Sequence, residues 1–176
     1  MKKNKLLMIF FLFFIFSCTL ETEKKPILIE CPEIIAKTAL DYAYEYSCAD
    51  TEYKWGGRDP LRSIKIDCSG LVFRCYDYAV LGTEYSLPFK DATVSTLFSD
   101  WSVKIDDPMP GDLIFMGENK NNPTHISLFV KKDSDNIYFI DATLKPEDNI
   151  NGVFERYYII DDYRLLSFGK LLLHKK

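Results

Sequence analysis

Histidine is scarce in this chain, with two residues of that type among 176. Cys-X-X-Cys pairs and the Cys/His spacings of zinc sites are also missing, so a structural metal is not indicated. Lysine and arginine are scattered and the net charge is −4, which argues against a nucleic-acid-binding surface. The chain is instead 47% hydrophobic and 15% aromatic, as is typical of a globular domain.

The chain also lacks an apolar run long enough for a membrane helix. The run at residues 6–16 falls short of the roughly 20 residues that a span needs. It follows a lysine-rich start and ends in Ser-Cys, as bacterial lipoprotein signals do. We therefore expect a signal peptide at residues 1–17, a lipid on Cys18, a tether over residues 18–31 and one domain over residues 32–176. Such a protein would be exported and anchored to a bacterial membrane. An ordinary signal peptide or a short uncleaved anchor is the alternative.

An exported chain can form disulfides. Cys31 and Cys48 flank a predicted helix and are candidates to pair across it. The alternative is that both are small buried hydrophobic residues.

The periodicity of the mature region predicts helices first and strands afterwards. A helical pattern begins at Pro32, and a glycine-rich loop interrupts it before a second helix that Asp67 can cap and Gly82 can end. The inner stripe of this second helix is expected to consist of Leu71, Val72, Cys75, Tyr78 and Ala79. A loop and a short helix follow. Runs typical of strands then succeed one another: "LIFM", "THISLFVKK", "IYFIDATL", "GVFERYYII" and "RLLSFGKLLL". This order predicts an α+β fold with a mainly antiparallel sheet.

Cys68 lies in "DCSG", in the first turn of the second predicted helix. The N–H groups and the positive dipole end of a helix stabilise a thiolate there. The Cys68 N–H could also bind the oxyanion of an attacked carbonyl, and Gly70 would let a substrate backbone approach. Polar neighbours on both sides favour an accessible thiol, whereas Cys75 on the same helix fits a core position.

A reactive thiol needs a base, and His125 is the better placed of the two histidines. His174 lies in the basic C-terminal tail, where we expect it to be solvated. A hairpin that turns at residue 133 sets His125 opposite Asp141, and a register slip of two sets it opposite Thr143 instead. An acid beside the histidine would orient the imidazole and stabilise its charged form. The alternative for Asp141 is an ordinary acid at a strand end.

Taken together, "YKWGG", "DCSGLVFRCY", "LP", "PGDLIFM", "THISLFV" and "YFIDAT" resemble, in this order, the motifs of the NlpC-type cell-wall peptidases. The likeness runs from about residue 32 to residue 173. It implies a papain-like α+β fold and a cysteine endopeptidase that cuts peptidoglycan stem peptides, typically between D-glutamate and the diamino acid.

The resemblance also implies roles for individual residues. Cys68 matches the nucleophile, His125 the general base, Asp141 the polar residue that orients the base, and Tyr53 the tyrosine that helps the oxyanion hole. The residues expected to contact the stem peptide are Asp67, Ser69 and Trp55. We expect a monomer without a cofactor or metal, whose partners are peptidoglycan and, through its N-terminal lipid, a membrane.

Three features depart from the family pattern. The third residue is commonly His, Asn or Gln, whereas Asp141 carries a charge that should raise the pKa of His125. Phe89 and Lys90 follow "LP" where arginine is frequent. "RDPLRSIKI" precedes Asp67 where Gly-Phe is frequent, which alters the rim of the cleft.

Two other functions are alternatives to the peptidase. An amidase or acyltransferase on a different acyl substrate would keep Cys68 and His125 but need a different pocket. A lipid-anchored wall-binding protein would need neither, and the presence of Cys68, His125 and Tyr53 together argues against it.

Overall fold

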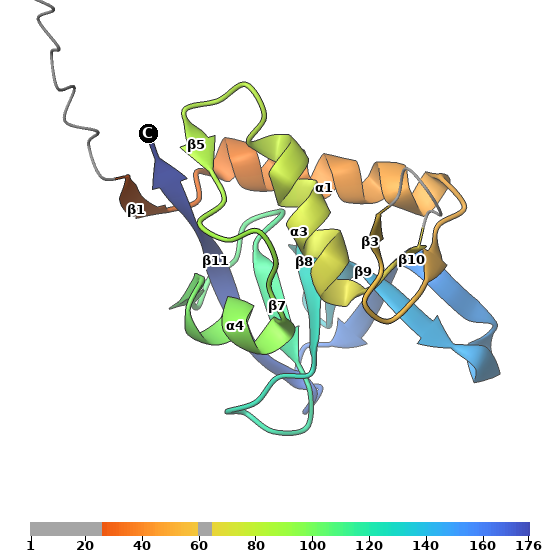
Figure 1. Cartoon of the computed structure of the whole chain (residues 1–176). Coiled ribbons are helices and arrows are strands. Elements are labelled where there is room, and N and C mark those ends of the chain that lie inside the picture. The colour runs from red at the N-terminus through yellow and green to blue at the C-terminus, as the bar shows by residue number, and fades with distance from the viewer. Residues whose placement is uncertain (1–25, 60–64) are drawn as a thin grey trace, which may run out of the picture.

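The computed structural model describes residues 26–59 and 65–176, in which two long helices pack on one antiparallel sheet (Figure 1). The helices are α1 (Glu33–Cys48), α3 (Cys68–Ala79) and α4 (Val94–Ser99). The strands are β1 (Ile27–Glu30), β2 (Glu52–Tyr53), β3 (Arg58–Asp59), β4 (Lys65–Ile66), β5 (Tyr85–Ser86), β6 (Ser102–Ile105), β7 (Leu113–Met116), β8 (His125–Lys132), β9 (Asn136–Lys145), β10 (Ile150–Ile159) and β11 (Leu165–Lys175), with a 3₁₀ turn at Pro146–Asp148.

The main sheet has the order β1-β11-β7-β8-β9-β10, and its neighbouring strands are antiparallel. β7 to β10 form the predicted meander, because each strand pairs with the next one along the chain. β11 then returns to the free side of β7, where it also pairs with β5 and β6. The α+β class predicted from the sequence is confirmed.

α1 and α3 cover one face of this sheet and supply one side of the core. The predicted stripe on α3 is buried at Leu71, Val72, Cys75 and Ala79. The tyrosine that completes it is Tyr76 rather than the expected Tyr78, which is half-buried. The Tyr76 hydroxyl donates to the carbonyl of Gly111 at 2.8 Å, which gives its buried polar end a partner.

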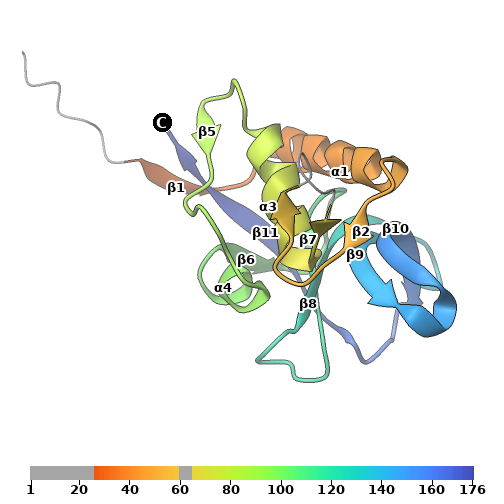
Figure 2. The same ribbon diagram turned by 45° about the vertical axis from the view of Figure 1, so that its right-hand side comes forward.

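A second, small sheet of order β2-β4-β3 lies beside the start of α3 (Figure 2). Its strands have two residues each, too few for periodicity to reveal them.

The folded unit begins ahead of the expected boundary at Pro32, because Ile27 to Glu30 pair with the end of β11. The expected signal peptide and Cys18 lie outside the described residues. No helix in the described part of the chain is long and apolar enough to cross a membrane.

The suggested Cys31–Cys48 disulfide is wrong. The two residues lie beyond one end and at the other end of α1, whose 16 residues extend roughly 24 Å at 1.5 Å per residue. A disulfide needs Cα atoms within about 7 Å. Cys31 is instead buried and Cys48 exposed, and both are free thiols.

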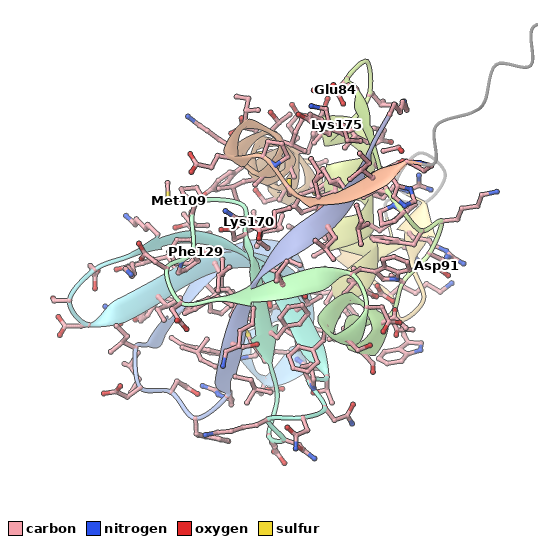
Figure 3. All side chains as sticks on the ribbon, turned by 90° about the vertical axis from the view of Figure 1, so that its left-hand side faces the viewer. Glu84, Asp91, Met109, Phe129, Lys170 and Lys175 are labelled. Carbon is pink, nitrogen blue, oxygen red and sulfur yellow. The ribbon has the colours of Figure 1, made fainter. Side chains whose placement is uncertain are left out.

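His174 does not lie in a solvated tail. It belongs to β11, where it pairs with Leu28 on one side and Ser86 on the other. Figure 3 shows Glu84 and Lys175 together at this end of the strand, and their side chains form an ion pair of 3.3 Å. This end of β11 lies on the opposite side of the molecule from β9 and β10 (Figure 1), so His125 is the histidine available to the nucleophile.

Gly111 sets how closely α1 approaches the sheet. Its φ is +94°, and a Cβ on it would lie 1.9 Å from the Ala36 carbonyl oxygen. We expect Gly111→Ala to lower the free energy of unfolding by at least about 3 kcal/mol, because backbone must move to admit the methyl group. Denaturant unfolding measures the loss.

The matched control is Gly82→Ala, whose φ of +75° carries similar strain but whose Cβ would meet none of the described atoms within 4 Å. That variant should lose only about 1–2 kcal/mol. Equal losses in the two variants would mean that backbone strain, and not the contact with α1, is what Gly111 relieves.

Candidate active site

Asp67 caps α3 as the sequence predicts and makes Cys68 the first residue of the helix. Its Oδ1 accepts a hydrogen bond from the Gly70 N–H at 2.7 Å and another from the Ser69 hydroxyl at 3.2 Å. The cap leaves the N–H of Cys68 at the exposed end of the helix dipole, where negative charge is stabilised.

The second oxygen of Asp67 holds the glycine loop against the helix. The Gly56 N–H donates to Oδ2 at 2.7 Å, and the Asp67 N–H donates to the Gly57 carbonyl at 2.9 Å. A Cβ on Gly70 would lie 2.4 Å from the same Gly57 carbonyl. Gly70 therefore makes room for the chain's own loop. It also lines the cleft beside Cys68, so the expectation that it admits a substrate backbone stays a prediction.

A cleft of about 360 Å³ opens beside the nucleophile. Cys68 is only 5% exposed, so the expectation of an open thiol is wrong, yet it lines the wall of this cleft. Trp55 is 83% exposed at the rim. Other lining residues are Gly56, Arg58, Asp67, Ser69, Asp91, Thr93 and Thr124.

Arg58 and Asp91 both line this cleft, and their side chains form an ion pair. Figure 3 shows Asp91 on the loop that leads into α4. The sequence indicated that the segment after Gly57 alters the rim, but it did not indicate that Arg58 finds a partner more than 30 residues away.

His125 begins β8, which packs against α3. Its Nε2 lies 2.5 Å from Asp141 Oδ2, which leaves Nδ1 as the nitrogen for the Cys68 side. Burial favours the neutral ring, but hydrogen bonds and charges of Asp141 and Cys68 outweigh it and raise the pKa of His125 from 6.5 to about 10. The imidazolium is therefore the favoured form beside Cys68 at neutral pH.

The strand register differs from the one first expected. Leu128 pairs with Ile140, and continuing this ladder sets His125 opposite Thr143, the slipped alternative, rather than opposite Asp141. Asp141 is one pair further along on the same face of the sheet, within reach of the imidazole.

A bulge between Phe129 and Lys131 makes this arrangement possible. Near the turn Lys132 pairs with Ile137, and that register, carried on unbroken, would put His125 and Asp141 on opposite faces of the sheet. The extra residue, Val130, shifts the ladder by one and returns both side chains to one face.

Arg156 is the residue that sequence reasoning missed. Its Nε donates to Asp141 Oδ1 at 3.0 Å, and its Nη2 contacts Oδ2. Burial favours the neutral acid, but the bonds and charges of His125 and Arg156 outweigh it and lower the pKa of Asp141. The available signal was an arginine within the apolar run "GVFERYYII", next in order after a strand with an internal acid.

Tyr53 ends β2 near the nucleophile, and its N–H donates to Asn151 Oδ1 on β10 at 2.9 Å. Burial, with smaller effects from Cys68 and Asp67, raises the pKa of Tyr53 to about 12. Its hydroxyl therefore stays protonated and able to donate. Among the described residues, no group of three or more His, Cys, Asp or Glu side chains could hold a metal ion.

Comparisons of sequence and of structure relate the chain to known proteins. The model of the NlpC/P60 family matches residues 50–160. The chain is 30% identical over 126 residues to dipeptidyl-peptidase 6 of Lysinibacillus sphaericus, a match that covers 71% of this chain and 38% of that protein. The crystal structure of Ly7917 is 12% identical with a TM-score of 0.45, over 80% of this chain and 61% of that one. The crystal structure of Ly7917 with the hydrolyzing product of MDP is 12% identical with a TM-score of 0.44, over 77% of this chain and 62% of that one.

The chain belongs to the NlpC/P60 family, because the family model matches more than half of it. Its α+β fold is the papain-like arrangement that the sequence predicted. The chain spans less than half the length of the curated relative it matches.

The charge on Asp141 should set the protonation of His125. We expect Asp141→Asn to lower the pKa of His125 from about 10 towards its ordinary range, because the neutral amide removes the charge that holds the ring proton. Titration of ¹⁵N-labelled histidine by NMR measures this. The stabilisation from the bound proton is full below the unfolded pKa, near 6.5, and is lost as pH rises through the folded value of about 10.

Asp107→Asn is the control, because it removes the same charge from an exposed residue paired with Lys132. It should leave the His125 titration unchanged. A His125 titration that is also unchanged in Asp141→Asn would show that the carboxylate does not govern the ring.

Proposed function

We propose that this protein is a cysteine endopeptidase that hydrolyses peptidoglycan stem peptides, with Cys68 as nucleophile and His125 as general base. The observation that carries the proposal is the alignment of Cys68, His125 and Asp141 beside a cleft at the capped end of α3. Membership of the NlpC/P60 family supports it.

Each step follows from a group already in place. The Cys68 thiolate attacks the carbonyl carbon of the scissile bond, and the Cys68 N–H and the Tyr53 hydroxyl stabilise the oxyanion. His125 gives its Nδ1 proton to the leaving amine, and the C–N bond breaks to leave a thioester on Cys68. His125 then takes a proton from water, whose oxygen attacks the thioester and releases the acid.

The scissile bond follows from the family resemblance, which points to the link between D-glutamate and the diamino acid. We infer that Trp55, exposed at the rim, packs on the stem peptide. Asp67 and Ser69 line the same cleft. Because Asp67 already accepts bonds from Gly56 and Gly70, any contact with the N-terminal side of the peptide uses its remaining acceptor capacity.

We expect Cys68→Ala and His125→Ala to lower the rate of muropeptide cleavage at least about 1,000-fold, because each removes a reacting group. Mass spectrometry of the products from purified muropeptides measures the rate and locates the bond. Cys75→Ala is the matched control, since Cys75 lies on the same helix with no exposed surface and burial raises its pKa. It should retain cleavage.

Cleavage that survives Cys68→Ala would overturn the assignment of the nucleophile. If the wild type cleaves no muropeptide but hydrolyses simple amides, the chemistry is right and the substrate class is wrong. If it cleaves neither and Cys68 resists alkylation, the protein binds the wall rather than hydrolysing it.

We also infer that Cys18 carries a lipid that anchors the enzyme to a bacterial membrane, from the lipoprotein-like sequence that precedes it. Expressed in a bacterium with an alkyne fatty acid, the wild type should incorporate the label and sediment with membranes. Cys18→Ser should lose the label, and Cys48→Ser, at an exposed cysteine of the domain, should keep it. A labelled Cys18→Ser protein would contradict the assignment.

A further inference from the structure

Asp141 is a fully buried carboxylate, with 0% of its surface exposed. Both of its oxygens are engaged by the guanidinium of Arg156, one through Nε at 3.0 Å and the other through Nη2. The second of these oxygens also receives His125 Nε2. The fork of the arginine thus fixes the plane of the carboxylate and the direction of the oxygen that meets the imidazole.

Arg156 is itself held in place. Its side chain is 12% exposed, and its guanidinium lies 5.2 Å from the ring centre of Phe139 and 5.9 Å from that of Tyr158. Phe139 is the β9 residue that pairs with Arg156, two places from Asp141 on the same face. Arginine stacks on aromatic rings and pairs with a carboxylate through two parallel bonds, which lysine cannot do.

A buried carboxylate without a cation takes up a proton, because desolvation favours the neutral acid. A protonated Asp141 would donate to His125 Nε2 instead of accepting from it. The single proton of the neutral ring would then lie on Nδ1, the nitrogen on the Cys68 side. In that tautomer the lone pair lies on Nε2, which meets Asp141, so Nδ1 cannot take the thiol proton.

We propose that Arg156 is a positioning residue that keeps Asp141 an acceptor, so that His125 can take up the proton of Cys68 and hold it on Nδ1. This inference rests on the proposed function for its catalytic meaning, but the state of the ring can be measured without any substrate. The four side chains, Cys68, His125, Asp141 and Arg156, form a relay from α3 across β8, β9 and β10.

The titratable groups that face this relay come from each element packed on it. They are Tyr53 from β2, Lys145 from β9, Tyr158 from β10, and Glu118 and Arg164 from the segments next to β7 and β11.

The test is the protonation of His125 in full-length protein with ¹⁵N-labelled histidine. The wild type should show both ring nitrogens protonated at neutral pH. Arg156→Gln should show a neutral ring with its proton on Nδ1, and the rate of Cys68 alkylation, mapped by mass spectrometry, should fall on the order of 100-fold. The deficit should be larger at acidic pH than at alkaline pH, because Asp141 regains its charge as pH rises.

Arg164→Gln is the matched control. Arg164 makes the same fork, with Asp162 at 2.9 and 2.6 Å, and lies 3.9 Å from the ring centre of Tyr158, but its carboxylate partner is not Asp141. The ring protonation and alkylation rate of this variant should match the wild type. Arg156→Lys keeps the positive charge that Arg156→Gln removes but lacks the two parallel bonds to Asp141. It should therefore show the wild-type protonation of the ring and the wild-type pH dependence, but only part of the wild-type rate of Cys68 alkylation.

A double-variant comparison separates action through Asp141 from general support. In an Asp141→Asn background, Arg156→Gln should change the alkylation rate less than about twofold, because the residue through which it acts is already neutral. The proposal is overturned if Arg156→Gln keeps the imidazolium, or if it lowers the rate equally with and without Asp141. Should Arg156→Gln fail to fold, Arg156→Lys decides, since an unchanged rate in that variant also overturns the role of the fork.

Muropeptide cleavage is the separate readout for the enzyme. If the ring changes as expected but no variant, the wild type included, cleaves muropeptides, the proposed function fails and the role of Arg156 stands. If the wild type cleaves and Arg156→Gln cleaves equally well at every pH, the proposed function stands and the role of Arg156 fails.

Discussion

The carboxylate of Asp67 is the interaction on which one half of the site depends. One oxygen caps α3 and the other binds the Gly56 N–H, so helix and loop are held by a single side chain. Because a cap is worth about 1 kcal/mol in an exposed helix, its energy alone does not explain this arrangement. Its larger effect is geometric: it fixes where α3 begins and therefore where Cys68 meets the cleft.

The other half of the site depends on charges that the sheet buries. His125, Asp141 and Arg156 come from three consecutive strands and alternate in sign when the ring is protonated. Each charge is stabilised by its neighbour, and the removal of one leaves another buried without compensation. A buried acid in the third position therefore works only where the next strand brings a cation to its far side, which Arg156 does here.

The parts of this structure that are contiguous in sequence were predictable, and the parts that depend on pairing were not. The cap at Asp67, the strand over Leu113–Met116 and the order of the meander follow from local residue types and periodicity. The bulge near Val130 and the partner of Arg156 depend on strand register, because a shift of one residue moves every side chain to the other face. β1 is exposed along most of its length, so it lacks the buried run that marks Leu113–Met116, and it depends on β11, the last strand of the chain, for its pairing.

This division has a consequence for how the site forms. The turn that presents Cys68 needs only the segment around Asp67 and the loop at Gly56, whereas the base needs β8, β9 and β10 in register with the bulge in place. Contacts between distant strands form at a greater entropic cost than contacts within a turn. A register error between β8 and β9 would therefore leave the capped helix and its thiol in place but set His125 and Asp141 on opposite faces of the sheet. The ion pairs along β8, β9 and β10 oppose that error. In the observed register Asp141 meets both His125 and Arg156, whereas in a register shifted by one residue it would be buried without either partner.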